Sequence, residues 1–198
     1  SGGEDAKFGL STAEILAATE MLKAENLGHC LKLVHFHIGS QVPDILIVKK
    51  AVQEASRFYA KLYKMGFQIG IHAIGDKANN WILNAYEKAI EVNGKRDSRH
   101  RDEHTQTVSL SDIPRFAKLG VIASMQPTHC ISDKLFYEKR VGYERCRGTY
   151  AWRSLLNTGA KLAFGTDYQV EPLNPMEGLY AAVTRKDRNG EEGEGWFP

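Results

Sequence analysis

The stretch Phe67-Gln68-Ile69-Gly70-Ile71-His72-Ala73 decides the fold class, because it is a short apolar run with a histidine near its end. Such a run predicts a β-strand. A segment of helical period follows from Lys77 to Val92 and ends at Asn93-Gly94, a pair that is typical of a helix stop. A strand followed directly by a helix is the repeating unit of parallel α/β proteins.

The same pattern recurs along the chain. We predict about five strands, all parallel, at Leu31 to His37, Phe67 to Ala73, His100 to Thr105, Val121 to Met125 and Lys161 to Gly165. A complete eight-stranded barrel typically needs about 250 residues. The sequence of 198 residues therefore predicts an α/β fold that is a partial TIM-barrel-like arrangement of parallel strands with crossover helices.

Two signals place helices outside the central repeat. Ser11 and Glu14 have the spacing of a capping box, which predicts a helix starting at Ser11. Apolar residues at helical spacing predict a second helix from about Pro43 to Met65. The segment from His129 to Arg147 is charged and aromatic, and it has no clear period.

Composition and charge exclude several classes of protein. With 26 Lys and Arg residues against 24 Asp and Glu, the formal net charge is +2, which argues against a nucleic-acid or polybasic membrane partner. No apolar run approaches the roughly 18 to 20 residues of a spanning helix. The widely spaced Cys30, Cys130 and Cys146 predict neither a disulfide framework nor a cysteine zinc site. We therefore expect a cytoplasmic protein with a small-molecule substrate and no nucleic-acid or membrane partner.

Polar side chains lie where the predicted strands end, which is where parallel barrels carry their functional groups. These positions hold His35, His37, His72, His104, Gln126, His129 and Asp167. Histidine and carboxylate groups on neighbouring strands suit a divalent metal, so His72, His104 and Asp167 are candidate ligands. Each residue also has a structural interpretation: a strand-end histidine is often only hydrogen-bonded, and Asp167 could cap its loop.

Residues from about 69 to 198 resemble the metal-dependent amidohydrolases, in particular the YtcJ-like branch (the amidohydrolase 3 group). The motifs that carry this resemblance are Ile71-His72-Ala73-Ile74-Gly75-Asp76-Lys77-Ala78, Glu103-His104-Thr105-Gln106, Asp112-Ile113-Pro114-Arg115-Phe116, Gly120-Val121-Ile122-Ala123-Ser124-Met125-Gln126-Pro127-Thr128-His129, Ala163-Phe164-Gly165-Thr166-Asp167 and Ala181-Ala182-Val183-Thr184-Arg185.

The amidohydrolase resemblance implies roles for the candidate ligands. His72 and His104 correspond to metal ligands from the fifth and sixth strands of the family's barrel. Asp167 corresponds to the eighth-strand aspartate that binds the metal and handles the proton of the attacking water. Gly165-Thr166 precedes Asp167 where the family usually has Gly-Ser. The implied cofactor is Zn²⁺ or another divalent metal.

The first 68 residues instead resemble biosynthetic arginine decarboxylase, a pyridoxal-phosphate enzyme. The carrying residues are Ser1-Gly2-Gly3-Glu4, Lys7-Phe8-Gly9-Leu10-Ser11, His35-Phe36-His37-Ile38-Gly39-Ser40-Gln41 and Ala51-Val52-Gln53-Glu54-Ala55-Ser56-Arg57-Phe58-Tyr59. In that family the counterpart of His37 lies against the cofactor ring, and the counterpart of Ser40 lies near its phosphate. The family's glycine-rich phosphate loop and Schiff-base lysine have no counterpart here, so pyridoxal phosphate is not expected to bind.

The two resemblances predict two domains. Residues 1–68 form an arginine-decarboxylase-like helix-strand-helix module, and residues 69–198 form the C-terminal half of an amidohydrolase-like barrel. A recombined, engineered or misassembled fusion explains this chimera-like junction better than divergence does. His35 and His37 face the same side of their strand; they could share a metal with His72 and His104, or be idle remnants of a cofactor pocket.

Three functional hypotheses follow. The first is metal-assisted hydrolysis of an amide or related C–N bond, with Asp167 as the proton carrier. The second is a catalytically empty fusion of barrel fragments, and the third a remnant arginine decarboxylase that uses His37 and Ser40.

A sheet of about five strands leaves open edges, which predicts self-association. Arg115, Arg145 and Arg185 are expected to be solvated surface charges.

Overall fold

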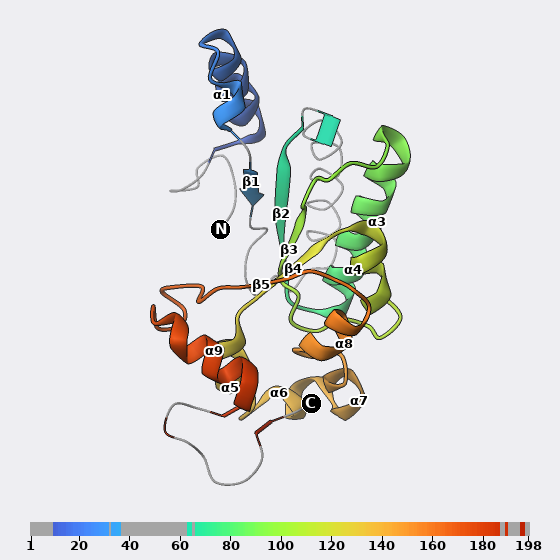
Figure 1. Ribbon diagram of the computed structural model, residues 1–198, viewed down its shortest axis with the longest axis vertical. Helices are drawn as coiled ribbons and strands as arrows, with labels where there is room; N and C mark the ends of the chain where they lie inside the picture. Colours follow the sequence, from blue (N-terminus) through green and yellow to red (C-terminus); the bar gives the residue numbers. More distant parts are fainter. Residues whose placement is uncertain are drawn as a thin grey trace.

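The computed structural model describes residues 10–31, 33–36, 63–64, 66–186, 189 and 195–196. Within them, five parallel strands form one sheet in the order β1-β2-β3-β4-β5 (Figure 1). The strands are β1 (Leu33–Phe36), β2 (Gln68–Ala73), β3 (Arg101–His104), β4 (Ile122–Met125) and β5 (Leu162–Phe164). Each lies inside its predicted range, so the predicted strands and the partial TIM-barrel-like α/β fold are confirmed.

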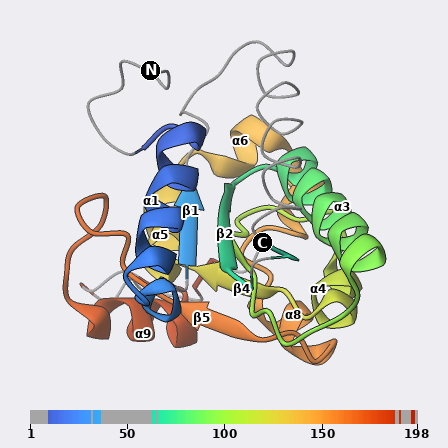
Figure 2. The same ribbon diagram turned by 90° about the horizontal axis from the view of Figure 1, so that it is seen from above.

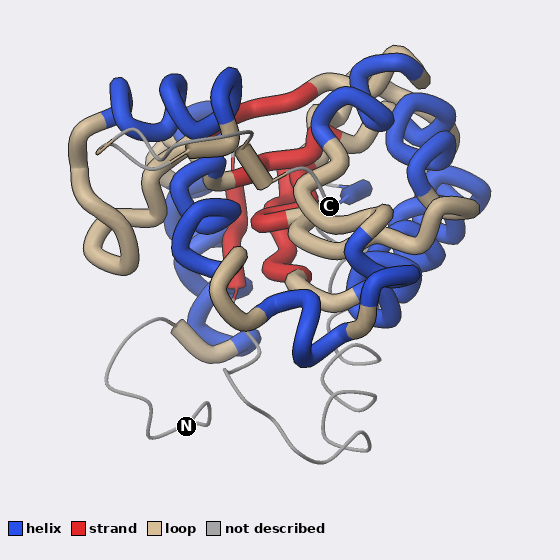
Figure 3. The backbone as a smooth tube through the Cα atoms, turned by 90° about the horizontal axis from the view of Figure 1, so that it is seen from below, coloured by secondary structure: helices blue, strands red, loops and turns tan. Residues whose placement is uncertain are grey.

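Helices connect the strands in the manner of parallel α/β proteins. Helix α3 (Asp76–Asn93) joins β2 to β3, α4 (Ile113–Leu119) joins β3 to β4, and α8 (Trp152–Asn157) precedes β5. These three helices pack side by side along one face of the sheet (Figure 2). Figure 3 shows the strands in the middle of the molecule with helices to either side.

The core lies between the sheet and these helices. Ile69 and Ile71 point from alternate positions of β2 into this layer and are 1% and 8% exposed. They belong to one buried cluster with Tyr86, Phe116 and Leu155 from α3, α4 and α8, all of which are fully buried. Burying a side chain of this size stabilises a fold by about 1.5–3 kcal/mol, so this layer holds the strand-helix units together.

The opposite face of the sheet carries charge. A Cβ atom at Gly70 would lie 2.8 Å from Glu103 Oε1, so a larger residue there would require this carboxylate to shift. Arg101 Nη2 pairs with Glu103 Oε1 at 2.5 Å. Because His72 is in register with Glu103, this ion pair lies on the face that His72 shares.

The helices outside the repeat are partly as expected. In α1 (Thr12–Ala24) the capping box is present, since Glu14 N donates to Ser11 Oγ and Ser11 N donates to Glu14 Oε2. Of the predicted helix from Pro43 to Met65, only residues 63–64 are described, so that helix stays a prediction. Among the described helices, none is long and apolar enough to cross a membrane.

Within the described ranges, four α-helices have no counterpart in the sequence predictions: α5 (Pro127–Asp133), α6 (Tyr137–Val141), α7 (Tyr143–Cys146) and α9 (Pro175–Thr184). The first three are 7, 5 and 4 residues long. A helix of one or two turns presents too few residues to show a 3.6-residue period, which is why the segment from His129 to Arg147 looked irregular.

The expectation that Arg185 is a solvated charge is wrong. Its guanidinium carbon lies 3.6 Å from the centre of the Trp152 ring, and Nη2 donates to the carbonyl of Tyr150 at 2.7 Å. The residue is 7% exposed, and burial lowers its pKa. An arginine that stacks on an aromatic ring and bonds the backbone can be buried.

The expectation of a solvated charge is also wrong for Arg115, whose side chain is 18% exposed and pairs with Glu87 and Asp112. Arg145, in contrast, is mostly exposed.

His100, the first residue of the predicted strand from His100 to Thr105, is part of the core. It is 2% exposed and stacks on Tyr86 with 5.1 Å between ring centres. Ile69 N donates to its Nδ1 at 3.1 Å. Burial, aided by the charge of Arg96, lowers the pKa of His100 to about 3.

We predict that His100 makes folding sensitive to acid. The unfolded chain takes up a proton near pH 6.5, whereas folded His100 does so only near its pKa of about 3. The contribution of neutral, buried His100 to the free energy of unfolding is therefore complete above pH 6.5. It is lost as the pH falls towards 3, by about 1 kcal/mol per pH unit. Urea unfolding at several pH values checks this. The variant His100→Gln should show a flatter pH profile, and equal slopes for both proteins would contradict the prediction.

Asp102 is an ionisable residue in the apolar core. It is in register with Ile71 and Ala123, both buried, and is 0% exposed. Neither carboxylate oxygen has a hydrogen-bond partner within the described residues. Burial, with a smaller contribution from Glu103, raises the pKa of Asp102 well above its usual value.

We predict that Asp102→Val stabilises the protein. The variant replaces an unsatisfied buried polar group with an apolar one of similar size, which should raise the free energy of unfolding by about 1–3 kcal/mol. Urea denaturation at pH 7 measures this. The matched control is Asp97→Val, since Asp97 is 68% exposed and its replacement should change stability by less than about 0.5 kcal/mol. A less stable Asp102→Val protein would show that the carboxylate has a role in the core.

Candidate metal centre

Four potential ligands meet at the carboxyl edge of the sheet. His72 is the penultimate residue of β2, and His104 is the last residue of β3. His129 lies in α5, which starts directly after β4, and Asp167 follows the end of β5. Because parallel strands end at the same edge, residues that are distant in sequence come together there.

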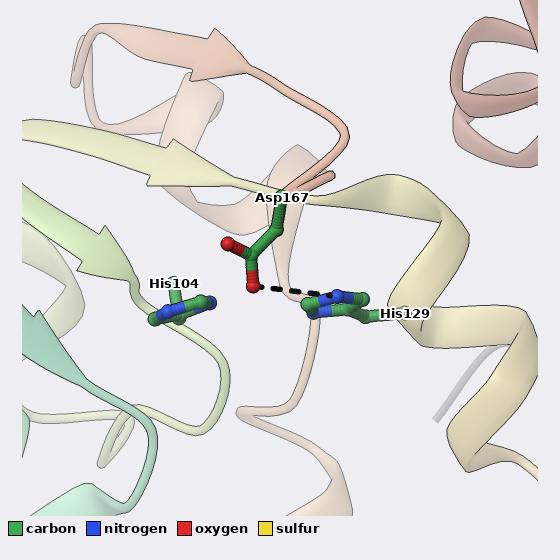
Figure 4. Close-up of side chains that lie close together, drawn as sticks. All are labelled: His104, His129 and Asp167. Carbon is green, nitrogen blue, oxygen red and sulfur yellow. Dashed lines mark ion pairs between the residues drawn. The ribbon is translucent and has the colours of Figure 1, made fainter. Parts of the chain in front are cut away.

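Three of these residues form a compact cluster. One candidate ligand atom from each of His104, His129 and Asp167 lies within 4.8 Å of the other two. Figure 4 shows the Asp167 carboxylate between the two imidazole rings. The Nε2 atom of His129 is 3.8 Å from Asp167 Oδ2, and the two rings are nearly parallel with 5.9 Å between their centres.

His72 lies beside the cluster. Its ring centre is 4.3 Å from that of His104, and the two rings are nearly perpendicular. Of the predicted set, the structure thus brings His104 and Asp167 together and places His72 against His104. The sequence places His129 just beyond a strand end but does not predict it as a ligand. The signal that could have found it is its position two residues after Pro127, directly beyond a strand.

The backbone is unusual at two of the clustered residues. The φ angles of His104 and Asp167 are 79° and 53°, in the left-handed region that non-glycine residues rarely occupy. Such conformations cost about 1–3 kcal/mol each and concentrate at functional sites. The sharp turns after β3 and β5 set the direction in which these two side chains leave the sheet edge.

Hydrogen bonding and burial prepare His104 to act as a ligand. Its Nδ1–H donates to Gln126 Oε1 at 2.8 Å, which leaves the lone pair on the other ring nitrogen. Burial lowers the pKa of His104, while the nearby Asp167 carboxylate opposes that effect. A lowered pKa favours the neutral imidazole, the form that binds metals.

A further observation supports a cation at this position. His129 Nε2 is buried and has no hydrogen-bond partner among the described residues, although a carboxylate lies 3.8 Å away. A buried ring nitrogen without a partner is costly, and coordination to an ion would satisfy it. Two imidazoles and one carboxylate also match the ligands that divalent transition metals prefer. The residues present fit a divalent metal.

Comparison with known proteins agrees with this geometry. A family model described as "Amidohydrolase family" matches residues 42–197. The chain belongs to the amidohydrolase family. It is 42% identical over 134 residues to Protein LONG AFTER FAR-RED 3 of Arabidopsis thaliana, covering 67% of this chain and 23% of that protein. It is 34% identical over 137 residues to the putative amidohydrolase YtcJ of Bacillus subtilis, covering 69% and 25%.

Solved structures show the same relationship for this amidohydrolase-family chain. An uncharacterized metal-dependent hydrolase from Pyrococcus horikoshii matches with a TM-score of 0.60 and 34% identity, over 68% of this chain and 26% of that one. A second metal-dependent hydrolase, from Pyrococcus furiosus, matches with a TM-score of 0.58 and 32% identity, over 67% and 26%. The chain spans about a quarter of the length of these relatives.

The N-terminal region matches a second family. A model described as the pyridoxal binding domain of pyridoxal-dependent decarboxylases covers residues 1–76. Biosynthetic arginine decarboxylase of Bacteroides thetaiotaomicron is 49% identical over 75 residues, 38% of this chain and 12% of that enzyme. The predicted mix of two families is confirmed. The two matches overlap at residues 42–76, and the domain boundary at residue 68 stays a prediction.

The residues predicted to contact pyridoxal phosphate are not part of the described structure. His37 and Ser40 both lie outside the described residues. The backbone of His35 is placed in β1, in register with Gly70 of β2. The hypothesis that His35 and His37 share a metal with His72 and His104 therefore stays a prediction.

Proposed function

We propose that this member of the amidohydrolase family is a metal-dependent hydrolase of amide or related C–N bonds in small molecules. The observation that carries the proposal is the cluster of His104, His129 and Asp167 at the carboxyl edge of the sheet. Its metal-dependent hydrolase relatives support the same class of reaction.

The proposed ligands are His104, His129 and Asp167, with His72 as a further ligand next to His104. Zn²⁺ is the proposed ion because imidazole nitrogens dominate the donor set. The three ligands His104, His129 and Asp167 would leave the fourth position of a tetrahedral zinc ion open to water, as in catalytic zinc sites. His72 as a fourth ligand would require a five-coordinate ion.

The chemistry is divided between the ion and Asp167. When bound, a divalent ion lowers the pKa of a water molecule towards neutrality and polarises the substrate carbonyl. The Asp167 carboxylate accepts the proton of the attacking water and then delivers it to the leaving nitrogen. The left-handed backbone at Asp167 directs its carboxylate to the cluster. Gln126 keeps His104 in one tautomer through the hydrogen bond at Nδ1.

A catalytically empty fusion of barrel fragments is the competing proposal, favoured by the matches to two families. A remnant arginine decarboxylase that uses His37 and Ser40 has less support, because the decarboxylase match covers residues 1–76 and includes none of the clustered residues. For the location of the protein we propose the cytoplasm, where three free cysteines would stay reduced.

Metal analysis tests the proposed function. Protein purified without a histidine tag should contain about one divalent ion per chain, as expected for one such cluster. The variants His104→Ala and His129→Ala should lose it, whereas His29→Ala should not, because His29 is exposed and precedes the amino end of β1 rather than following a carboxyl end. Metal loss in His72→Ala would identify His72 as a further ligand. A protein without metal, or with metal unaffected by His104→Ala, would favour the empty fusion.

A second prediction separates metal binding from catalysis. Asp167→Asn should retain much of the metal, because an amide oxygen can still coordinate. Hydrolysis of simple N-acyl amides should fall by about 10²–10⁴-fold, because the amide cannot accept the proton. Parallel metal analysis and hydrolysis assays check this. Unchanged hydrolysis by Asp167→Asn would show that another group carries the proton.

We also propose that two copies associate. In the described sheet, β1 and β5 each pair with one neighbouring strand, which leaves open edges. Met176, Leu179 and Val183 have helical spacing on α9 and are 64%, 52% and 80% exposed. An apolar stripe of this kind supports contact with a second copy.

Light scattering after size-exclusion chromatography tests the association. The unmodified protein should elute as a dimer or larger species, and Leu179→Glu with Val183→Glu should shift it towards the monomer. Val92→Glu is the control, because Val92 is 67% exposed but lies on α3. A monomer at high concentration would contradict the proposal.

A further inference from the structure

Two carboxylates flank a single imidazole nitrogen at the metal centre. His129 Nε2 lies 3.8 Å from Asp167 Oδ2 and 4.0 Å from Glu171 Oε1. Asp167 and Glu171 both come from the segment between β5 and α9, whereas His129 comes from α5. Glu171 is not part of the three-residue cluster, so it lies next to the centre rather than within it.

The carboxylate of Glu171 is held in place. Its side chain is 11% exposed, and Ser132 Oγ donates to Oε1 at 2.7 Å. Ser132 is three residues after His129 in α5, so the two side chains lie on the same face of the helix. Helix α5 therefore presents both the imidazole and the hydroxyl group that orients Glu171 beside it.

Charge balance gives this arrangement a function. With neutral imidazoles, His104, His129 and Asp167 together carry one negative charge, whereas the ion carries two positive charges. Removing an ion from water is costly unless nearby charges compensate for it. Glu171 is the partly buried acid beside His129 that would supply the second negative charge.

We propose that Glu171 is a positioning residue of the metal centre, which balances the charge of a divalent ion beside His129 and is itself oriented by Ser132. This inference rests on the proposed metal-dependent function. The competing interpretation is structural: the Ser132–Glu171 hydrogen bond would only tie α5 to the segment after β5. The two interpretations differ in whether the charge of Glu171 matters.

Zinc affinity, measured by competition with a chelating dye, tests the proposal. Glu171→Gln removes the charge but keeps an oxygen that can accept from Ser132, so zinc should bind about 10–100-fold more weakly. Glu171→Asp keeps the charge and should recover part of the affinity. Ser132→Ala should weaken zinc binding less than Glu171→Gln does. Glu91→Gln, which removes an exposed charge near the end of α3, should have no effect.

The melting temperature of the metal-free proteins provides the second readout. A role in charge balance predicts that metal-free Glu171→Gln melts like the unmodified protein and gains less stability on adding zinc. Unchanged zinc affinity in Glu171→Gln would overturn the proposal. So would a loss of affinity that Ser132→Ala reproduces in full and Glu171→Asp does not recover. If the unmodified chain binds no divalent metal, the proposed function itself fails, together with the role of Glu171.

Discussion

Parallel pairing of neighbouring strands is the constraint on which the candidate site depends. The backbone groups of each strand need hydrogen-bond partners, and pairing in one direction satisfies them while aligning all carboxyl ends. The register places His72 opposite Glu103 and Met125 opposite Phe164. Chain segments separated by whole strand-helix units therefore end at the same edge, where their side chains meet.

Several residues near this edge have energetically unfavourable backbone conformations or unsatisfied polar atoms. His104 and Asp167 adopt left-handed backbone conformations, and the buried Nε2 of His129 has no hydrogen-bond partner in the described part of the chain. Asp102, two residues before His104, is buried, and neither carboxylate oxygen has a partner among the residues that the structure describes. The apolar layer between sheet and helices provides the stability that offsets such costs. Departures from local rules concentrate at functional sites, which is consistent with a site at this edge.

The residues of the candidate metal cluster all come from one of the two matched families. His104, His129 and Asp167 all lie in the region that matches the amidohydrolase family and outside the decarboxylase match. Strand β1 lies only within the decarboxylase match, yet it pairs with β2 in the same parallel direction. Strand-helix units from different barrels share strand spacing and direction, which explains how such a strand can extend the sheet.

Much of the fold could be predicted because short apolar runs and helix stop signals are local. Apolar alternation in Phe67 to Ala73 and the stop at Asn93-Gly94 place one strand-helix unit without further information. The short helices from Pro127 to Cys146 could not be predicted, since they have too few turns to show a period. The burial of Arg185 could not be predicted either, because Trp152 and the Tyr150 carbonyl come from another segment of the chain.

The candidate site, like the fold, could be predicted from the sequence only in part. The sequence by itself determined that His72, His104 and Asp167 lie at strand ends, because strand positions follow from local patterns. Only the tertiary structure decided that His129 joins His104 and Asp167, and that Glu171 lies beside them. The reason is physical: which side chains meet depends on the register between strands and on the turns that follow them. These are set by long-range packing that no local pattern records.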